Sequence, residues 1–214
     1  MKFAKLAAIA VAFAFGSADA AVITFQTGAS TAGVQNSAND YRDAVDLAVA
    51  NSPYGAAVRL DNYDNVSNQS IFSASAQNIA FKSTITFGLT SAGSYAFRAG
   101  VDFGNGGAVF LDGTQVALTT HDMWWGGSYD NASQIFSITG QSLTAGNHTL
   151  AIYGLEGCCD GGQQVQFSAN GGAFQSFSVN SMAPVPEPET YAMMLGGLGV
   201  VGALARRRRV KQAA

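Results

Sequence analysis

Apolar and polar residues alternate along several short segments in the middle of this chain. Ile79–Phe87 and Tyr95–Phe103 show the pattern most clearly, because most alternate positions in them carry a large apolar side chain. A period of two places these side chains on one face of a β-strand. Turn signals of Gly, Asn and Asp separate the segments at spacings of about ten residues, which indicates an all-β sandwich or jelly roll. The other segments with this pattern are Val109–Leu111, Leu150–Ile152, Val165–Phe167 and Phe177–Val179.

Residues 40–50 depart from the strand pattern. Tyr41, Val45 and the pair Leu47-Ala48 recur at roughly helical spacing, and Pro53 follows them. Because proline cannot continue a helix, the spacing predicts one short helix that ends before Pro53. We therefore expect a single β domain over residues 21–180 with at most one short helix.

The N-terminus has the three parts of a secretory signal. Lys2 and Lys5 precede an uncharged run from Leu6 to Phe15, and the small residues Ala18 and Ala20 follow. This order predicts a signal peptide over residues 1–20. The alternative, an N-terminal membrane anchor, needs a longer apolar run than this one. Export would place the mature chain where thiols tend to oxidise.

The C-terminus also has three parts in a fixed order. A proline-rich linker over residues 181–190 comes first, and proline at this density keeps a backbone extended. Residues 191–205 follow without a charge and predict a short transmembrane sorting helix. A basic tail over residues 206–214 is expected to stay cytoplasmic. It begins with Arg206, Arg207, Arg208 and Arg209.

The linker contains Val185, Pro186, Glu187 and Pro188, and the apolar run and the arginine cluster follow it. Together these features resemble the PEP-CTERM sorting signal of Gram-negative bacteria. The resemblance implies export through the Sec translocon, transient anchoring in the inner membrane, and processing by an exosortase near the proline motif. It places the product on the cell surface or in the extracellular matrix. An ordinary anchor near the C-terminus, without processing, is the alternative.

The body of the chain is acidic. Between residues 21 and 184 the cations are Arg42, Arg59, Lys82 and Arg98, against eleven acidic residues. Nucleic-acid binding depends on cations that neutralise phosphates, so this composition argues against a nucleic-acid partner. It favours solubility and divalent cations.

Signatures of catalysis are largely missing from the sequence. The only histidines are His121 and His148, and neither accompanies a Gly-x-Ser-x-Gly nucleophile motif. His148 starts a predicted strand, where we expect a histidine on the surface at the sheet edge. A thiolate nucleophile is not expected, because the only two cysteines are adjacent and would oxidise to a disulfide. We therefore predict that the protein is not an enzyme.

Three blocks of sequence contain the candidate ligand-binding residues. Residues 101–113 describe a hairpin with a carboxylate at each end, residues 121–130 hold both tryptophans, and residues 156–162 form a glycine-rich loop. In this order they resemble the CCXG group of PEP-CTERM proteins and, more distantly, the protective-antigen-type and GLEYA sugar-binding β-sandwiches. The resemblance implies a carbohydrate site. Its candidate residues are Asp102, Asp112, Trp124, Trp125, Glu156 and Asp160.

The same resemblance makes calcium a candidate cofactor, with Asp102 and Asp160 as its candidate ligands. The lectins hold calcium with two consecutive aspartates, whereas here Phe103 follows Asp102. Calcium therefore stays open at this stage.

Cys158 and Cys159 are adjacent in the glycine-rich loop. Adjacent Cα atoms lie about 3.8 Å apart, which is closer than an ordinary disulfide prefers. A bond between them closes almost no loop, so it would stabilise the fold little. It would instead fix a turn and direct Glu156 and Asp160 toward one spot. Two reduced thiols or an intermolecular bridge are the alternatives.

Two functions are consistent with these observations. The first is an exosortase-processed surface or matrix protein that binds carbohydrate, with extracellular polysaccharide of a biofilm or floc as its partner. The second is a purely structural surface or matrix protein without a defined ligand site. Adjacent residues on a strand point to opposite faces, so we expect one of Trp124 and Trp125 in the core and the other outside.

Overall fold

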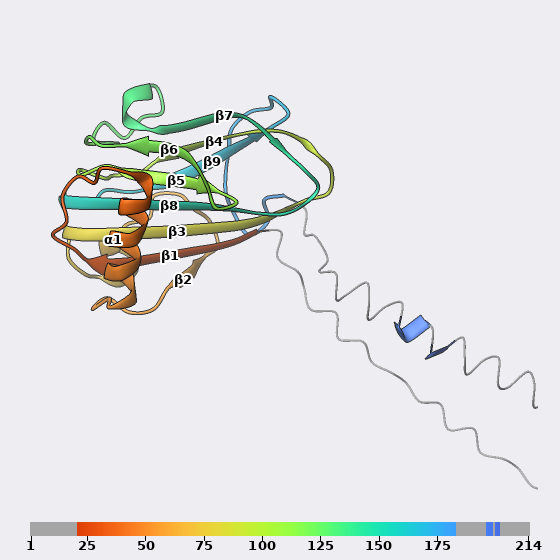
Figure 1. Cartoon of the computed structure of the whole chain (residues 1–214), viewed down its shortest axis with the longest axis horizontal. Coiled ribbons are helices and arrows are strands. Elements are labelled where there is room, and N and C mark those ends of the chain that lie inside the picture. The colour runs from red at the N-terminus through yellow and green to blue at the C-terminus, as the bar shows by residue number, and fades with distance from the viewer. Residues whose placement is uncertain (1–20, 183–195, 199, 202–214) are drawn as a thin grey trace, which may run out of the picture.

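The structure is a computed structural model that describes residues 21–182, 196–198, 200 and 201 (Figure 1). The predicted signal peptide over residues 1–20, Val185–Pro188 and Arg206–Arg209 lie outside the described residues, as does most of the predicted sorting helix. Within the described part of the chain, no helix is both long and apolar enough to cross a lipid bilayer.

Two antiparallel sheets make up the domain, as predicted for an all-β sandwich (Figure 1). The larger sheet has six strands in the order β2-β1-β3-β8-β5-β6, and the smaller has four in the order β10-β9-β4-β7. The six are β1 (Ala21–Ala29), β2 (Val58–Leu60), β3 (Gln77–Leu89), β5 (Gly107–Leu111), β6 (Thr114–Thr119) and β8 (Gly146–Cys158). The four are β4 (Gly93–Gly100), β7 (Phe136–Leu143), β9 (Gln164–Ala169) and β10 (Gln175–Ser176).

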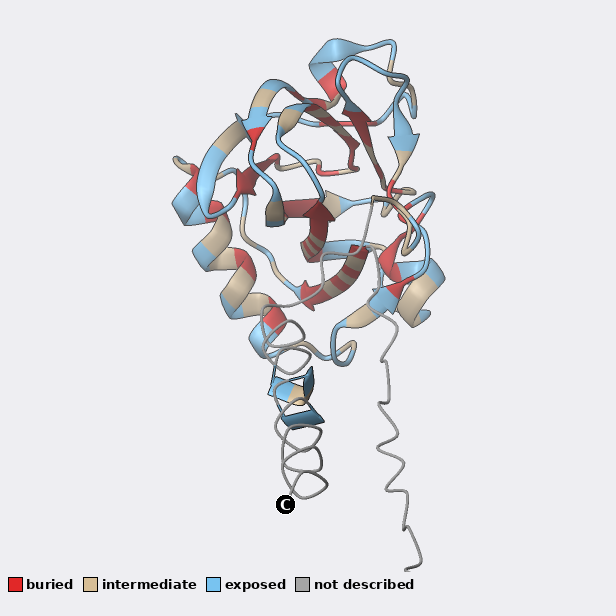
Figure 2. Ribbon diagram, turned by 90° about the vertical axis from the view of Figure 1, so that its right-hand side faces the viewer, coloured by how far each residue is buried: buried red, intermediate tan, exposed pale blue. Residues whose placement is uncertain are grey.

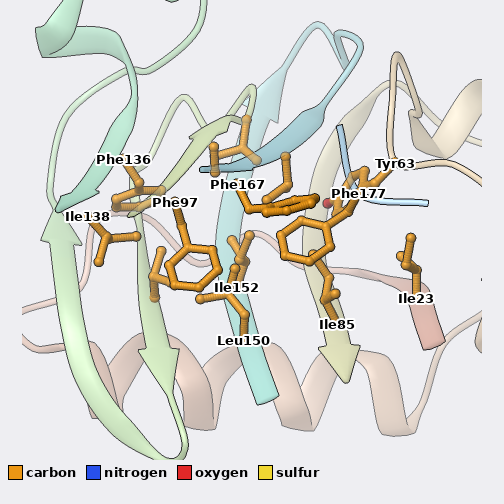
Figure 3. Packing of buried hydrophobic residues seen from close by; sticks show 14 of the residues in the cluster. Ile23, Tyr63, Ile85, Phe97, Phe136, Ile138, Leu150, Ile152, Phe167 and Phe177 are labelled. Atoms are coloured by element: carbon orange, nitrogen blue, oxygen red, sulfur yellow. The ribbon is translucent and has the colours of Figure 1, made fainter. Parts of the chain in front are cut away.

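The main core lies between the two sheets. Alternate residues of the strands point inward, so the apolar alternation in the sequence becomes one continuous packed layer (Figure 3). Phe177 packs at its centre, with its ring 5.7 Å from that of Phe87 and 6.2 Å from that of Phe97, centroid to centroid. Buried residues concentrate in the strands, whereas the loops are mostly exposed (Figure 2).

Helix α1 (Ala38–Ala50) covers the outer face of the six-stranded sheet (Figure 1). Ser37 caps its first turn by accepting a hydrogen bond from the Asp40 amide at 3.2 Å. Tyr41, Val45 and Val49 recur on one face of the helix and are buried in a second, smaller apolar cluster against the sheet. The predicted helix over residues 40–50 is thus present.

Two elements correct the expectation of at most one short helix. Helix α2 (Asn68–Phe72) and the 3₁₀ helix η1 (Ala132–Gln134) are also present. Ser67 and Ser70 form a capping box that starts α2, and these serines carry no hydrophobic periodicity that would announce a helix. Such short elements depend on local side-chain caps rather than on an apolar face.

The longest strands, β3 and β8, pair along their whole length and define two ends of the domain. Gln77 pairs with Cys158 at one end and Leu89 with Gly146 at the other. Since each strand has thirteen residues, the two ends are separated by about 40 Å. Ala21 pairs with Phe87, and its amide donates to the Val179 carbonyl, so both lie at the second end. We call the two ends the Cys158 end and the Ala21 end.

Candidate functional site

A pocket of about 530 Å³ opens at the Cys158 end. Three segments far apart in the sequence form it: the loop after β4, the loop after β6, and the end of β8 with the residues that follow. The residues that line it are Asp102, Gly104, Asn105, Asp122, Trp125, Glu156, Gly157, Cys158 and Cys159. All three sequence blocks singled out above therefore contribute to one concave site.

Glu156 lies at the base of this pocket and is only 3% exposed. Its Oε2 accepts a hydrogen bond from the Gly104 amide, and its Oε1 accepts one from the Cys158 amide at 2.6 Å. Burial raises the pKa of this carboxyl, and the backbone amides oppose part of that rise. The amides fix the carboxylate in place and join the β4–β5 loop to the end of β8.

Asp102 is the half-buried carboxyl on the opposite loop. Its Oδ2 accepts a hydrogen bond from the Gly161 amide at 2.7 Å. Burial, followed by the repulsion of Glu156, raises its pKa to about 6, and Asp122 and Asp160 add to the repulsion. The pocket therefore concentrates negative charge that backbone amides only partly compensate.

Two glycines permit this arrangement because their missing side chains leave room for the carboxylates. A Cβ on Gly104 would lie 2.8 Å from Oε1 of Glu156, and a Cβ on Gly161 would lie 2.4 Å from Oδ2 of Asp102. Glycine is therefore required at these two positions of the pocket loops. It lets backbone amides approach carboxylates that a larger residue would push away.

The two tryptophans lie in different environments, as expected, although they lie in the loop after β6 and not on a strand. Trp125 is 70% exposed and lines the pocket, whereas Trp124 is 6% exposed. Trp124 is held in the core, where its Nε1 donates to the Gly162 carbonyl at 2.9 Å. Trp124 does not line the pocket, which corrects its inclusion among the candidate ligand residues. Its hydrogen bond to Gly162 instead holds the loop that follows Cys159.

In the structure the sulfurs of Cys158 and Cys159 are bonded to each other. Both residues are exposed and line the pocket. The amides of Cys159 and Asp160 both donate to the Ala76 carbonyl, at 2.8 and 3.0 Å. Cys159 also has a positive φ of 77°, which few residues other than glycine adopt. The turn is thus held by the disulfide on one side and by backbone hydrogen bonds on the other.

Asp160 does not line the pocket, which corrects its placement. Its Oδ2 accepts a hydrogen bond from the Gln69 amide at 2.8 Å, so the carboxylate is directed toward the first turn of α2. Burial raises the pKa of Asp160, and hydrogen bonds from the start of α2 oppose the rise. Helix α2, which the sequence did not predict, thus binds the Asp160 carboxylate through a backbone amide.

Asp112 is also placed elsewhere, at the Ala21 end. Its carboxylate accepts hydrogen bonds from Nδ1 of His148 and from the Thr149 amide, at 2.7 and 2.8 Å. His148 is 7% exposed, so the expectation of a surface histidine is wrong as well. The hairpin of residues 107–119 places its turn at the end of β8 opposite the pocket. The alternation of apolar residues predicts strands but does not predict at which end of the sheet the turn between β5 and β6 lies.

Asp122 and Asn105 line the pocket although neither was a candidate. Asp122 directly precedes the segment with the tryptophans, and its charge contributes to the raised pKa of both Asp102 and Glu156. The carbonyl of Asn105 accepts a hydrogen bond from the Tyr41 hydroxyl at 2.6 Å, which ties the pocket loop to α1. The position of Asp122 beside the tryptophans is the signal that could have identified it.

The candidate calcium ligands Asp102 and Asp160 do not share the pocket. Over the described residues, no group of three or more His, Cys, Asp and Glu side chains is arranged to hold a metal ion.

Comparison with known proteins gives two results. The model of the PEP-CTERM protein-sorting motif matches residues 184–209, so the chain carries this sorting motif at its C-terminus. No curated protein matches the sequence.

Solved structures resemble the domain. A PA14 sugar-binding domain from an RTX adhesin is 17% identical with a TM-score of 0.50, covering 74% of this chain and 95% of its own. The PA14 domain of the antifreeze protein MpAFP is 17% identical with a TM-score of 0.46, covering 79% and 94%. An anti-sigma factor domain-containing protein from Clostridium clariflavum is 14% identical with a TM-score of 0.49, covering 82% and 53%. The first of these similarities identifies the fold as a PA14-like β-sandwich.

Proposed function

We propose that this chain, a PA14-like β-sandwich with a PEP-CTERM sorting motif, is an exported surface or matrix protein that binds extracellular polysaccharide in the pocket at the Cys158 end. The observation that carries the proposal is Trp125, a large indole left 70% exposed on the wall of a concave site. An exposed indole beside fixed hydrogen-bond acceptors is a suitable surface for a sugar ring.

The chemistry of the pocket supports this proposal. The C–H face of a sugar ring packs against indole, and its hydroxyl groups donate hydrogen bonds to carboxylates. Glu156 and Asp102 are held by backbone amides, so they need not reorganise when a ligand enters. The pocket volume is also within the range of sites that hold small ligands, about 300–1,000 Å³. The similar PA14 domain from an RTX adhesin is itself described as sugar-binding.

The position of the pocket also favours a surface role. Ala21 and Val179 lie together at the Ala21 end, and the sorting motif begins shortly after the domain. Glu156 in the pocket lies about 27 Å along β8 from His148, which is level with Ala21 in the sheet. In a chain exported by Sec and held in the inner membrane of a Gram-negative bacterium by its tail, the pocket would lie at the end of the domain opposite the Ala21 end, where the described domain stops. Exosortase processing would then release the domain to the cell surface or the matrix.

The hydrogen bonds of Glu156 and of the two histidines do not favour catalysis. Both oxygens of Glu156 accept backbone hydrogen bonds, which suits a fixed acceptor better than a proton donor. His148 is bonded to Asp112 at the Ala21 end, and Nε2 of His121 lies 2.9 Å from the Ser133 carbonyl. We therefore place the protein among binding proteins rather than enzymes.

The experiment that tests carbohydrate binding is a glycan array with the purified protein, with and without calcium. We expect saturable binding, and we expect Trp125→Ala to weaken it at least tenfold without changing the melting temperature. Leu47→Ala is the matched control, because Leu47 is 69% exposed on α1 and does not line the pocket. If Trp125→Ala bound matrix polysaccharide as well as Leu47→Ala, the purely structural function would be favoured instead.

Processing of the tail is tested separately by mass spectrometry of the surface form. We expect a C-terminus near residues 185–190. A tail intact through Ala214 would argue for simple anchoring.

A further inference from the structure

We infer that the polysaccharide recognised by this pocket carries free amino groups, as in a deacetylated amino-sugar polymer. This inference rests on the proposed carbohydrate site and names its ligand class. Trp125 would pack against the sugar ring while Asp102 and Asp122 accept hydrogen bonds from its ammonium group. Glu156 would supply negative charge from the base of the pocket.

The first argument is the charge of the pocket. Asp102, Asp122 and Glu156 all line it, and no lysine or arginine is among the lining residues. Burial is the largest cause of the raised pKa of Asp102, and the negative charges of Glu156 and Asp122 raise it further. A ligand that brings a positive charge would remove this repulsion, whereas a neutral sugar would leave it in place.

The basic side chains of the domain are engaged elsewhere. Lys82 forms an ion pair with Asp46 at 2.7 Å on the α1 face of the sheet. The Arg98 guanidinium lies between two aromatic rings, 4.0 Å from the centroid of Tyr129 and 4.2 Å from that of Phe174. Like them, Arg42 and Arg59 are not lining residues. The negative charge of the pocket is therefore compensated by solvent or by a ligand, and not by a lysine or arginine that lines it.

The second argument is the aromatic wall. An indole face attracts cations as well as the C–H face of a sugar. Trp125 is the large exposed aromatic side chain of this pocket. An amino sugar presents a ring and an ammonium group about one bond length apart, so the indole and the carboxylates can engage one residue of the polymer together.

The third argument separates an ammonium group from a metal ion. Calcium requires six to eight oxygen ligands. Here both oxygens of Glu156 and one oxygen of Asp102 already accept backbone hydrogen bonds. An ammonium group needs only three acceptors, and they can be a remaining oxygen of Asp102, the exposed Asp122 carboxylate and water. The available oxygens thus fit the smaller requirement.

The test compares three probes by isothermal titration and tryptophan fluorescence on the full chain: a glucosamine tetramer, an N-acetylglucosamine tetramer and spermidine. We expect the glucosamine tetramer to bind at least tenfold more tightly than the acetylated one at low salt. Asp122→Asn should reduce this preference several-fold, because it removes one acceptor charge from an exposed position. Asp61→Asn is the matched control, since Asp61 is also exposed and does not line the pocket.

Each outcome has a distinct meaning. Equal binding of the two tetramers, lost in Trp125→Ala, would overturn the amino-sugar inference and leave the carbohydrate site standing. Spermidine binding as tightly as the glucosamine tetramer would also overturn it, because charge alone would then explain the affinity. A retained preference for glucosamine in Asp122→Asn together with Asp102→Asn would contradict the assigned acceptors. If no sugar on a full array binds, the proposed function itself fails.

Discussion

The carboxylates at the two ends of strand β8 have different partners. At the Ala21 end, Asp112 accepts hydrogen bonds from the His148 ring and from the Thr149 amide. At the Cys158 end, roughly 27 Å further along the strand, Glu156 lies with Asp102 and Asp122 around one pocket. One end pairs its acid with a group that can carry positive charge, and the other places three acids together.

This difference separates stability from binding. A carboxylate paired with histidine and an amide contributes to the free energy of folding. Carboxylates that repel one another reduce it, and groups with such perturbed pKa values are typical of functional sites. We therefore expect substitutions at the Ala21 end to lower stability, and substitutions at the Cys158 end to affect ligand binding more than stability.

The largest effect on stability is expected for Asp112→Ala at the Ala21 end. This change removes two hydrogen bonds and leaves the buried His148 ring without its acceptor, so the free energy of unfolding should fall by about 2 kcal/mol. Urea denaturation at pH 6 measures it. Asp61→Ala is the control, and an equal loss in both variants would show that the pairing with His148 contributes nothing.

The pH dependence sharpens this test. Burial lowers the pKa of His148, but the hydrogen bonds to Asp112 and the Thr144 carbonyl outweigh burial and leave the pKa raised. A raised pKa means that the stabilisation is fully present below the ordinary value of about 6.5 and is lost as the pH rises through the folded value. The cost of Asp112→Ala should therefore be larger at pH 6 than at pH 9.

A smaller effect of opposite sign is expected for Asp102→Asn at the Cys158 end. The pKa of Asp102 is raised to about 6 from the ordinary 3.8, so its ionisation at pH 7 disfavours the folded state. The neutral amide removes this cost and still accepts from the Gly161 amide. After allowance for solvent screening of a half-exposed group, the variant should be about 1 kcal/mol more stable at pH 7.

The difference between Asp102→Asn and the parent protein should disappear below about pH 4, because the aspartate is then protonated in both the folded and the unfolded state. Thermal melts at pH 3.5, 5 and 7 measure the trend. A variant that is less stable than the parent at pH 7 would mean that the charge of the Asp102 carboxylate is compensated in the native protein. The proposed difference between the two ends would then be wrong.

The sequence predicted the sandwich and most of the loops that form the site, for physical reasons. Segments such as Ile79–Phe87 alternate strictly enough that only a strand buries their apolar face, and the structure places them in β3. The three blocks around Asp102, Trp125 and Glu156 end or follow strands, so they meet where strand ends meet. One tryptophan of the pair is exposed and the other buried, as expected, but both lie in the loop after β6, so the alternation of a strand is not the cause.

Features that depend on register or on local caps were missed. Strand β1 alternates as clearly as β3 but begins directly at the predicted cleavage site, and β6 and β7 carry few large apolar residues, so none of the three is among the predicted strands. The distance between Asp112 and the pocket depends on which end of β5 pairs with which end of β8. The capture of Asp160 by α2 depends on a helix set by serine caps. Composition contains neither kind of information.

The Cys158–Cys159 disulfide lies at the Cys158 end, so we expect it to affect ligand binding more than stability. Its bond closes a loop of minimal length, so it removes little conformational entropy from the unfolded chain. The turn keeps the hydrogen bonds of the Cys159 and Asp160 amides to the Ala76 carbonyl even without it. Stability is thus a weak reason for the bond, whereas fixing the pocket wall is a strong one.

The smallest effect on stability is therefore expected for the double variant Cys158→Ser with Cys159→Ser. Its free energy of unfolding should change by about 1 kcal/mol or less, because no long loop is opened. Binding of matrix polysaccharide should fall by more than that, because both residues line the pocket and the wall would lose its preorganisation. Free-thiol titration with peptide mapping first establishes that the bond is present in the secreted parent protein. A double variant that unfolds readily yet binds polysaccharide normally would reverse the assignment and make the disulfide a structural element, like the Asp112 pair at the other end.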